Sequence, residues 1–303
     1  METILTTNLL TKQFKHQKAV DSVSVQIERG AIYGLIGRNG AGKTTFLRMI
    51  AGLARPTSGE MEIMGFHSNG GKLSTAFERV GSLIEQPGLY HHLDAFENCK
   101  LKAICCGVYS RDYVNQKLSL VGLGDVGKKT VGHFSLGMKQ RLGIALAMIG
   151  EPDLLILDEP INGLDPQGII EVRDIIQKIN REQNITVIIS SHILEELSKI
   201  ATHYGFIHNG RLVRQLSREA LMEQCADRLE IVTDTPDKAC TVLDRLGCEY
   251  KVVDRQTLHV LNHIDNGAMI NAALGAEGIA VAAIGKKNES LEDYFIELIH
   301  QAN

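Results

Sequence analysis

The sequence predicts an α/β domain with a largely parallel core sheet, followed by a smaller α+β domain. Short apolar runs that suit buried strands alternate with stretches of helical periodicity over about the first 218 of the 303 residues. A glycine-rich loop at residues 37–45 joins one of these runs to a helical stretch, and two carboxylates, Asp158 and Glu159, directly follow another. Strands that alternate with helices in this way are typical of a domain with a mainly parallel sheet.

Each element of the first domain follows from a local pattern. Polar residues 15–18 separate two expected N-terminal strands, and the turn at residues 56–60 leads into an alternating strand. Residues 94–127 carry few β-branched runs, and we expect a mainly helical subdomain at about residues 90–150. The strands are expected at residues 3–10, 19–27, 31–36, 61–64, 154–157 and 186–190, and further helices at residues 44–53, 142–148 and 168–180.

The character of the chain changes after about residue 218, so we place a boundary between domains at residues 1–218 and 219–303. The expected order beyond it is strand, helix, strand, strand, helix, strand, which is the order of a ferredoxin-like split unit. A capping box at residues 290–293 begins a closing helix. Within the unit, strands are expected at residues 229–232, 250–253, 258–261 and 279–284, and helices at residues 236–246 and 268–274.

Composition and charge disfavour several classes of protein. A formal net charge of −4 and a pI near 6.3 argue against a strongly basic nucleic-acid surface. The six cysteines form no C-x-x-C pair and no zinc-finger spacing, so we interpret them as reduced thiols of a cytosolic protein. No secretory signal is apparent, and no apolar run approaches the length that crosses a bilayer. We therefore expect a soluble chain that reaches a membrane only through a partner.

The loop at residues 37–45 has the composition of a phosphate cradle. Glycines let backbone N–H groups wrap around phosphates, and the N-terminus of the following helix adds positive partial charge. Lys43 would reach the outer phosphates, and Thr44 would bind Mg²⁺ through its hydroxyl. The alternative is a chance glycine-rich turn, which the strand–loop–helix context disfavours. The expected nucleotide-binding positions are Gly37, Asn39, Gly40, Ala41, Gly42, Lys43, Thr44 and Thr45.

Asp158 and Glu159 stand at the end of a predicted buried strand. Ligands of parallel α/β sheets bind at this edge, so both carboxylates should face the cradle. Asp158 suits the Mg²⁺ shell, through water, and Glu159 is placed to act as a general base on an attacking water. The alternative is an acidic turn without function, which is improbable beside a cradle in the same domain.

Ser135 and Gly137 come just before a helical run. A serine and a glycine in this position form a second anion-binding helix terminus. Taken alone, the two residues are better explained as a plain N-cap.

Together these motifs resemble the nucleotide-binding subunit of an ATP-binding cassette (ABC) transporter, in that family's order, over roughly the first 215 residues. The glycine loop matches the Walker A motif, residues 154–159 the Walker B motif, and residues 134–140 the signature. Residues 162–165 match the D-loop, and His192 matches the switch histidine. The resemblance implies a P-loop NTPase cassette that hydrolyses ATP with Mg²⁺. It also implies a dimer in which each ATP lies between the Walker motifs of one copy and the signature of the other.

The resemblance assigns roles to individual residues. Ser135 and Gly137 would hold the γ-phosphate of the ATP bound to the second copy. His192 would contact the same phosphate, and Asp165 would couple the two sites. Phe14 matches the aromatic residue that stacks on adenine, although a core phenylalanine is a nearly equal interpretation. The catalytic set that follows is Lys43, Glu159 and His192.

The Q-loop position departs from the family pattern. Alignment on Pro87 puts Glu85, and not a glutamine, where the family senses Mg²⁺ and the transmembrane subunit. A carboxylate is a hard oxygen donor and can still bind Mg²⁺, so Glu85 joins Thr44 and Asp158 in the expected metal set. A shift of one residue would put Gln86 at this position instead. The segment that follows, residues 87–100, would form the docking surface for a cytoplasmic helix of the partner, or merely the edge of a helical subdomain.

Residues 85–90, 135–143 and 290–295 are similar to those of bacitracin- and lantibiotic-type exporters. These are bacterial ABC-2 systems that pump peptide antibiotics away from the cell. The similarity implies a second copy of the chain, a separately encoded ABC-2 type transmembrane subunit, and no nucleic-acid partner. It also implies a cytoplasmic location, peripheral on the inner face of the membrane. The membrane subunit selects the substrate, so the expectation of a peptide-antibiotic substrate rests on analogy with these exporters alone.

Two other classes of function compete with this interpretation. A nucleic-acid-handling or ribosome-associated ABC ATPase would require a coiled-coil insertion, zinc-site cysteines or tandem cassettes, and the sequence has none of these. Salt-sensitive binding of DNA or RNA would reveal such a function. The third possibility is a regulatory module, in which the C-terminal unit senses a small molecule while the cassette switches state. The sequence shows no evident ligand site in that unit.

Overall fold

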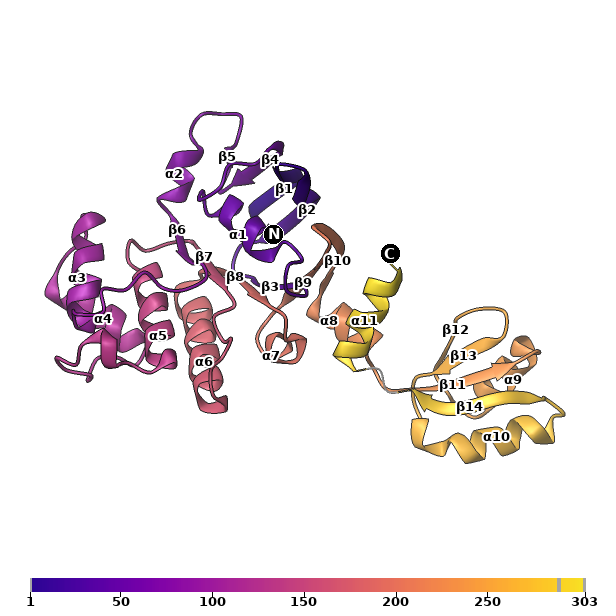
Figure 1. The fold of residues 1–303 in the computed structure, drawn as a ribbon. Helices are drawn as coiled ribbons and strands as arrows, with labels where there is room; N and C mark the ends of the chain where they lie inside the picture. The colour runs from indigo at the N-terminus through magenta and orange to yellow at the C-terminus, as the bar shows by residue number, and fades with distance from the viewer. Residues whose placement is uncertain (1, 288–289, 302–303) are drawn as a thin grey trace. The chain divides into compact units, whose positions relative to one another are not determined.

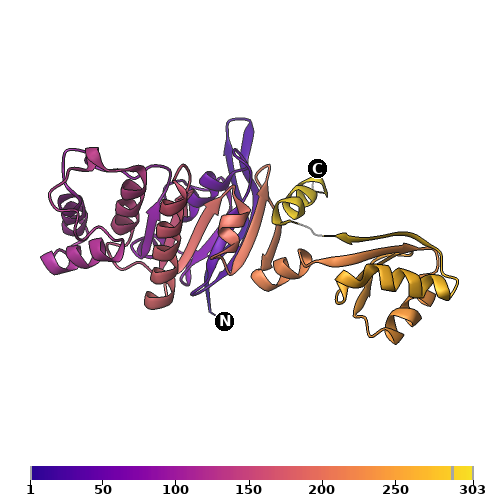
Figure 2. The same cartoon turned by 90° about the horizontal axis from the view of Figure 1, so that it is seen from below.

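The computed structural model describes residues 2–287 and 290–301 of the chain. The chain forms two compact units, Met1–Arg218 and Glu219–His300, and each is considered by itself. Figures 1 and 2 show the elements of both units from two directions.

The first unit contains an antiparallel sheet with the strand order β2-β1-β4-β5. The two N-terminal strands are longer than predicted, because β1 and β2 stay paired up to the last pair before the turn, Phe14 with Gln17. This extension places Phe14 at the tip of a strand. The strands are β1 (Thr3–Phe14), β2 (Gln17–Glu28), β4 (Ser58–Ile63) and β5 (Phe66–His67).

A second sheet of six strands has the order β10-β9-β3-β8-β7-β6. Five of its strands are parallel, and only β10 runs antiparallel to its neighbour β9. The prediction of a largely parallel core sheet is therefore confirmed. The strands are β3 (Ile32–Ile36), β6 (Val80–Leu83), β7 (Leu154–Asp158), β8 (Thr186–Ser191), β9 (His203–His208) and β10 (Arg211–Ser217).

The register of this sheet brings three strand ends together. Ile36 at the end of β3 pairs with Ser191 of β8, and Asp158 at the end of β7 pairs with Ser190 of β8. The segments that leave β3, β7 and β8 therefore start side by side at one edge of the sheet. This is the edge where parallel α/β sheets bind ligands.

Helices surround the parallel sheet and form a separate cluster beyond it. α3, α4 and α5 pack against one another, and α5 also packs against α6. Figure 1 shows α3, α4 and α5, in purple and magenta, gathered on one side of the first unit. The helices of this unit are α1 (Lys43–Ile50), α2 (Leu73–Phe77), α3 (Ala95–Cys105), α4 (Arg111–Leu120), α5 (Leu136–Ala147), α6 (Pro166–Gln183) and α7 (Leu194–Ser198).

Helix α1 is anchored in the core that joins the two sheets. Phe46, Leu47, Met49 and Ile50 are fully buried, and they share one apolar cluster with side chains of both sheets. Burial of each such side chain contributes about 1.5–3 kcal/mol to stability. The start of α1, where the glycine-rich loop ends, therefore rests on a rigid base.

The second unit has the split βαββαβ topology of a ferredoxin-like domain. Its four strands are antiparallel, in the order β12-β13-β11-β14, and its core combines alternate strand residues with one side of α9 and α10. Ser290 caps α11 by accepting a hydrogen bond from the backbone N–H of Asp293 at 3.0 Å. The elements are α8 (Arg218–Gln224), β11 (Arg228–Thr233), α9 (Pro236–Arg245), β12 (Tyr250–Val252), β13 (Thr257–Val260), α10 (Gly267–Ala276), β14 (Val281–Lys287) and α11 (Leu291–Gln301).

Among the helices of residues 2–287 and 290–301, none combines the length and the apolar character that a bilayer-spanning segment needs.

Candidate nucleotide-binding and catalytic site

The loop between β3 and α1 is a tight turn, and two of its positions accept only glycine. Gly42 has a φ of 106°, and a Cβ atom there would lie 2.4 Å from the carbonyl oxygen of Ala19. At Gly37, a Cβ atom would lie 2.5 Å from the carbonyl oxygen of Ile207. The two glycines therefore let the loop backbone pass closer to its neighbours than any residue with a Cβ atom would allow.

Helix α1 begins inside this loop. Its N-cap residue is Gly42 in the left-handed conformation, and no side chain caps the helix. The first N–H groups of an uncapped helix are unsatisfied donors with a positive partial charge, which suits a phosphate group.

Lys43 is almost entirely buried and is held inside the loop. Its side chain is 6% exposed, and its Nζ donates to the carbonyl oxygen of Gly37 at 2.7 Å. The same Nζ lies 3.0 Å from Oε1 of Glu159. The ammonium group is thus fixed between the phosphate loop and the end of β7.

Thr44 and Asp158 meet as a pair of hard oxygen donors. The Oγ1 of Thr44 donates to Oδ2 of Asp158 at 2.7 Å, and the Oγ of Ser190 donates to Oδ1 of Asp158 at 2.6 Å. Over the described residues, no group of three or more His, Cys, Asp or Glu side chains could hold a metal ion by itself. A hydroxyl and one carboxylate fit Mg²⁺, which takes few protein ligands and completes its shell with phosphates and water.

Glu159 lies between two cationic or ionisable partners. Its Oε1 faces Lys43, and its Oε2 is 2.8 Å from Nδ1 of His192. The backbone at Glu159 has a φ of 49°, and its N–H donates to Oγ of Ser190 at 2.9 Å. Non-glycine residues in this conformation are uncommon and are found at functional sites.

A cavity of about 490 Å³ opens over the glycine loop. This volume suits a small ligand such as a nucleotide. The cavity wall combines the loop from Asn39 to Thr45 with Glu159, Phe14 and the turn at Asn209 and Gly210. Phe14 is 53% exposed, so the interpretation as a core phenylalanine is wrong.

Lys18 also lines this cavity, and it belongs to a network of charged hydrogen bonds. Asp21 on β2 accepts hydrogen bonds from Lys18 at 2.8 Å and from Arg211 on β10 at 2.8 and 2.9 Å. These hydrogen bonds, that of Lys18 above all, lower the pKa of Asp21 to about 2. The ionised carboxylate therefore joins the two sheets and orients Lys18 at the edge of the cavity.

Ser135, Gly137 and Asp165 are not among the described residues that line the cavity. Ser135 is the N-cap of α5, with its Oγ accepting from the N–H of Met138 at 3.2 Å. Asp165 caps α6 by accepting from the N–H of Gly168 at 3.1 Å. Ser135 and Asp165 are exposed. Within one chain, the signature helix and the phosphate loop therefore present separate surfaces.

Glu85 forms an ion pair with a side chain of α1. Its carboxylate is bonded to Arg48 of α1 at 2.8 Å, with the Glu85 side chain 60% exposed, and it does not line the nucleotide cavity. Its neighbour Gln86 lines a different pocket.

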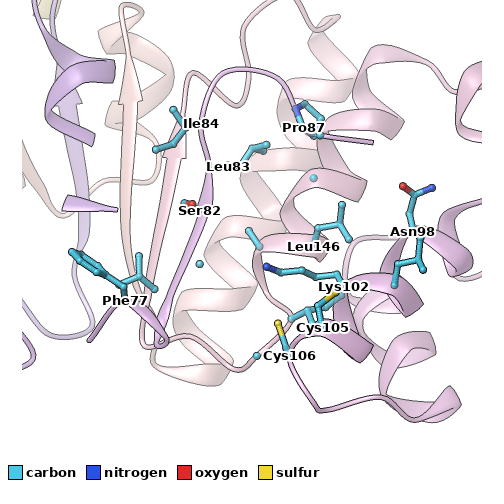
Figure 3. A pocket seen from close by; sticks show the side chains of 18 of the residues that line it. Phe77, Ser82, Leu83, Ile84, Pro87, Asn98, Lys102, Cys105, Cys106 and Leu146 are labelled. Atoms are coloured by element: carbon cyan, nitrogen blue, oxygen red, sulfur yellow. The ribbon is translucent and has the colours of Figure 1, made fainter. Parts of the chain in front are cut away.

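That second pocket is a groove of about 1000 Å³ between the end of β6 and the helical cluster. Figure 3 shows Phe77 and Leu83 on one side of it, and Lys102 and Cys105 of α3 on the other. Leu101 of α3 also lines the groove and is 41% exposed. The wall is therefore partly apolar and open to solvent.

Sequence reasoning missed several residues of the site. From the sequence, Ser190 is expected only as the last residue of a strand, although Ser190 bonds both to Asp158 and to the backbone of Glu159. Gln17, Lys18 and Asn209 line the cavity from elements far away in the sequence. The register of β7 with β8, the pairing of β1 with β2 and the turn between β9 and β10 place these residues, and a local sequence motif contains none of this information.

Comparison with known proteins places this geometry in a family. A family model described as "ABC transporter" matches residues 20–162. The bacitracin transport ATP-binding protein BcrA of Bacillus licheniformis is 42% identical, over 99% of this chain and 98% of its own. The chain belongs to the ABC transporter family. It is an ABC-type ATPase, and the sequence-based identification is confirmed.

Other relatives agree with this assignment. The lantibiotic transport ATP-binding protein SrtF of Streptococcus pyogenes is 44% identical over 67% of this chain and 86% of its own. The ADP- and Pi-bound dimeric cassette MJ0796 has a TM-score of 0.64 over 71% of this chain and 99% of its own, at 24% identity. That structural likeness shows the fold of the ABC ATPase's first unit.

Proposed function

We propose that this ABC ATPase works as a dimer that binds two Mg²⁺–ATP and drives a separate membrane subunit of a peptide-antibiotic exporter. The observation that carries the proposal is the meeting of Lys43, Thr44, Asp158, Glu159 and His192 at one edge of the parallel sheet. The protein would be cytoplasmic and would lie on the inner face of the membrane through an ABC-2 type partner.

In this proposal, the loop N–H groups and the start of α1 bind the phosphates of ATP. Lys43 leaves Glu159 and turns to the outer phosphates, since one ammonium cannot serve both partners in full. Thr44 and Asp158 would hold Mg²⁺, which neutralises phosphate charge when bound. Phosphoryl transfer of this kind depends mainly on positioning and electrostatics, so a rigid base under α1 favours catalysis.

Once released by Lys43, Glu159 acts as the general base. Glu159 accepts a proton from the attacking water. His192, which stays within hydrogen-bond reach of Glu159, contacts the γ-phosphate at the same time. Ser190 keeps the backbone of Glu159 in its strained conformation through the bond to its N–H.

The second copy completes the site. Ser135 and Gly137 lie on a different surface from the cradle, so they would reach a γ-phosphate only across a dimer interface. The space beside Gly137 is open, because a Cβ atom there would meet nothing nearer than Leu164 at 3.8 Å. Binding of ATP would favour the closed dimer, and hydrolysis would release it.

The names of two relatives support the choice of substrate. BcrA is described as a bacitracin transport protein and SrtF as a lantibiotic transport protein. A strain that lacks the ATPase but keeps its membrane partner tests this, by measurement of its susceptibility to bacitracin, to a lantibiotic and to an unrelated small antibiotic. The proposal predicts greater susceptibility to a peptide antibiotic, rescued by the wild-type chain but not by Lys43→Ala. Unchanged susceptibility to both peptides would contradict the substrate assignment.

The groove beside α3 is the proposed docking surface for a cytoplasmic helix of the partner. Its open, partly apolar wall suits an amphipathic helix. Leu101→Glu should abolish resistance while the purified chain keeps its basal ATPase activity. Val252→Glu, at an exposed valine of the second unit, is the matched control and should leave resistance intact.

A further inference from the structure

Lys12 lies directly over the ring of Phe14. Its Nζ is 5.1 Å from the ring centroid, within the range of a cation–π contact. The two residues are two positions apart on β1, so both side chains emerge near the end of the same strand. Phe14 lines the nucleotide cavity, and Lys12 does not. Lys12 therefore touches this ring from outside the cavity.

The ammonium group of Lys12 is itself fixed. Its Nζ donates to the carbonyl oxygen of Arg55 at 2.6 Å. Arg55 lies in the connection between α1 and β4, and α1 begins at the phosphate loop. The contact thus ties the tip of β1 to the far end of the helix that starts at Lys43.

The ring of Phe14 needs such a support because the core does not supply one. Its backbone is held by pairing with Gln17, but its side chain is 53% exposed. An exposed aromatic side chain is free to change rotamer, and this freedom is lost when a base stacks on it. A cation seated on one face restricts the ring and leaves the opposite face for a flat ligand.

We propose that Lys12 is a positioning residue for nucleotide binding: it holds Phe14 so that the ring's free face accepts the adenine base. The inference rests on the proposed adenine platform at Phe14. The cation also draws electron density away from the free face, and this reduces repulsion between the two stacked π systems. Lys12 acts through Phe14 and does not contact the phosphates of the bound nucleotide.

The test compares a ligand that has a base with one that has none. Dissociation constants for ADP and for inorganic pyrophosphate are measured by calorimetry for the wild type, Lys12→Met, Lys12→Arg, Phe14→Ala and the double variant Lys12→Met with Phe14→Ala. Methionine keeps the length of the side chain and removes the charge, and arginine restores a cation. Melting temperatures verify that all variants are folded.

Lys12→Met should weaken ADP binding by about two- to fivefold, the worth of an exposed cation–π contact, and leave pyrophosphate binding unchanged. Lys12→Arg should restore the affinity for ADP, and in the Phe14→Ala background Lys12→Met should have no further effect. An equal loss for both ligands, or an undiminished effect without Phe14, would overturn the inference.

Two outcomes separate this inference from the proposed function. If Phe14→Ala weakens ADP binding but Lys12→Met does not, the result contradicts the positioning role of Lys12 and leaves the adenine platform at Phe14 intact. If Phe14→Ala leaves ADP binding unchanged, the result contradicts both the adenine platform at Phe14 and the positioning role of Lys12.

Discussion

Lys43 Nζ lies 3.0 Å from Glu159 Oε1, inside a site where the other oxygen of the same carboxylate faces His192. One carboxylate thus engages the two side chains that a γ-phosphate would need. In the proposed mechanism, the nucleotide would replace Glu159 as the partner of Lys43, and this exchange would free the carboxylate to act on water. The contact would then link occupation of the cradle to release of the general base.

The first prediction contrasts two carboxylates that follow strands of the same sheet. Glu159→Gln should lower the ATPase rate by at least about 100-fold, because general-base catalysis contributes about 10²–10⁴-fold. Glu85→Gln should keep most of the activity, because Glu85 forms only an exposed ion pair with Arg48. Steady-state phosphate release measures both. Equal rates for the two variants would show that the role given to Glu159 is wrong.

The second prediction concerns the hydroxyl that fixes the acidic strand end. Ser190→Ala removes bonds to Asp158 and to the backbone of Glu159, so we expect a lower kcat and a higher Mg²⁺ concentration at half-maximal activity. Ser198→Ala is the control. It also removes a side-chain hydrogen bond, from Ser198 to the carbonyl oxygen of Glu195, but this bond lies within α7 and involves neither Asp158 nor Glu159. Each should cost about 1 kcal/mol of stability. If both variants kept the wild-type Mg²⁺ dependence, Ser190 would have no positioning role.

The third prediction compares two glycines of the cradle. Gly42→Ala forces a Cβ atom to within 2.4 Å of a backbone oxygen and should abolish ATP binding. Gly40→Ala, at a φ of 80° with open space around it, should cost only about 1–2 kcal/mol in backbone strain. Nucleotide titration with a thermal melt of each variant separates the two effects. Tight ATP binding by Gly42→Ala would refute the geometry of the loop.

The fourth prediction follows from the lowered pKa of Asp21. The carboxyl titrates near 3.8 when unfolded and near 2 when folded, so its stabilising effect is complete above the unfolded value. That effect is lost as the pH falls from about 4 towards 2, because the proton binds the unfolded chain first. Asp21→Asn should therefore be less stable than the wild type at pH 6, and the difference should shrink at pH 3. Urea titrations at both values check this, and a constant difference would contradict it.

The fold class was predictable because its strongest signals are local. Buried strands such as β7 and β8 are continuous apolar runs, and α1 and α6 have clear helical periodicity. Strands β6, β9 and β10 were not predicted. β6 has only four residues, and β10 alternates weakly because its side chains are only partly buried. Such edge and near-edge strands are recognised by their pairing, which sequence patterns do not contain.

The site was predictable where one motif supplies all its parts. The cradle and the two carboxylates were found because a loop or a strand end places them together. The anchoring of Asp158 by Ser190 depends on strand register, and the pairing of Glu85 with Arg48 depends on the path of the chain after β6. The contact of Lys12 with Phe14 depends on a side-chain rotamer. These relationships arise from tertiary packing.

The most direct test of the account is the mass of the Glu159→Gln variant in solution, measured by light scattering after gel filtration with and without Mg²⁺–ATP. This variant should bind ATP without splitting it, so the account predicts a monomer without nucleotide and a stable dimer with it. Adding Ser135→Arg should return the protein to the monomer while Lys43 still binds ATP. A variant that binds ATP and stays monomeric, while the wild type hydrolyses ATP at its usual rate, would contradict the claim that two copies share each nucleotide.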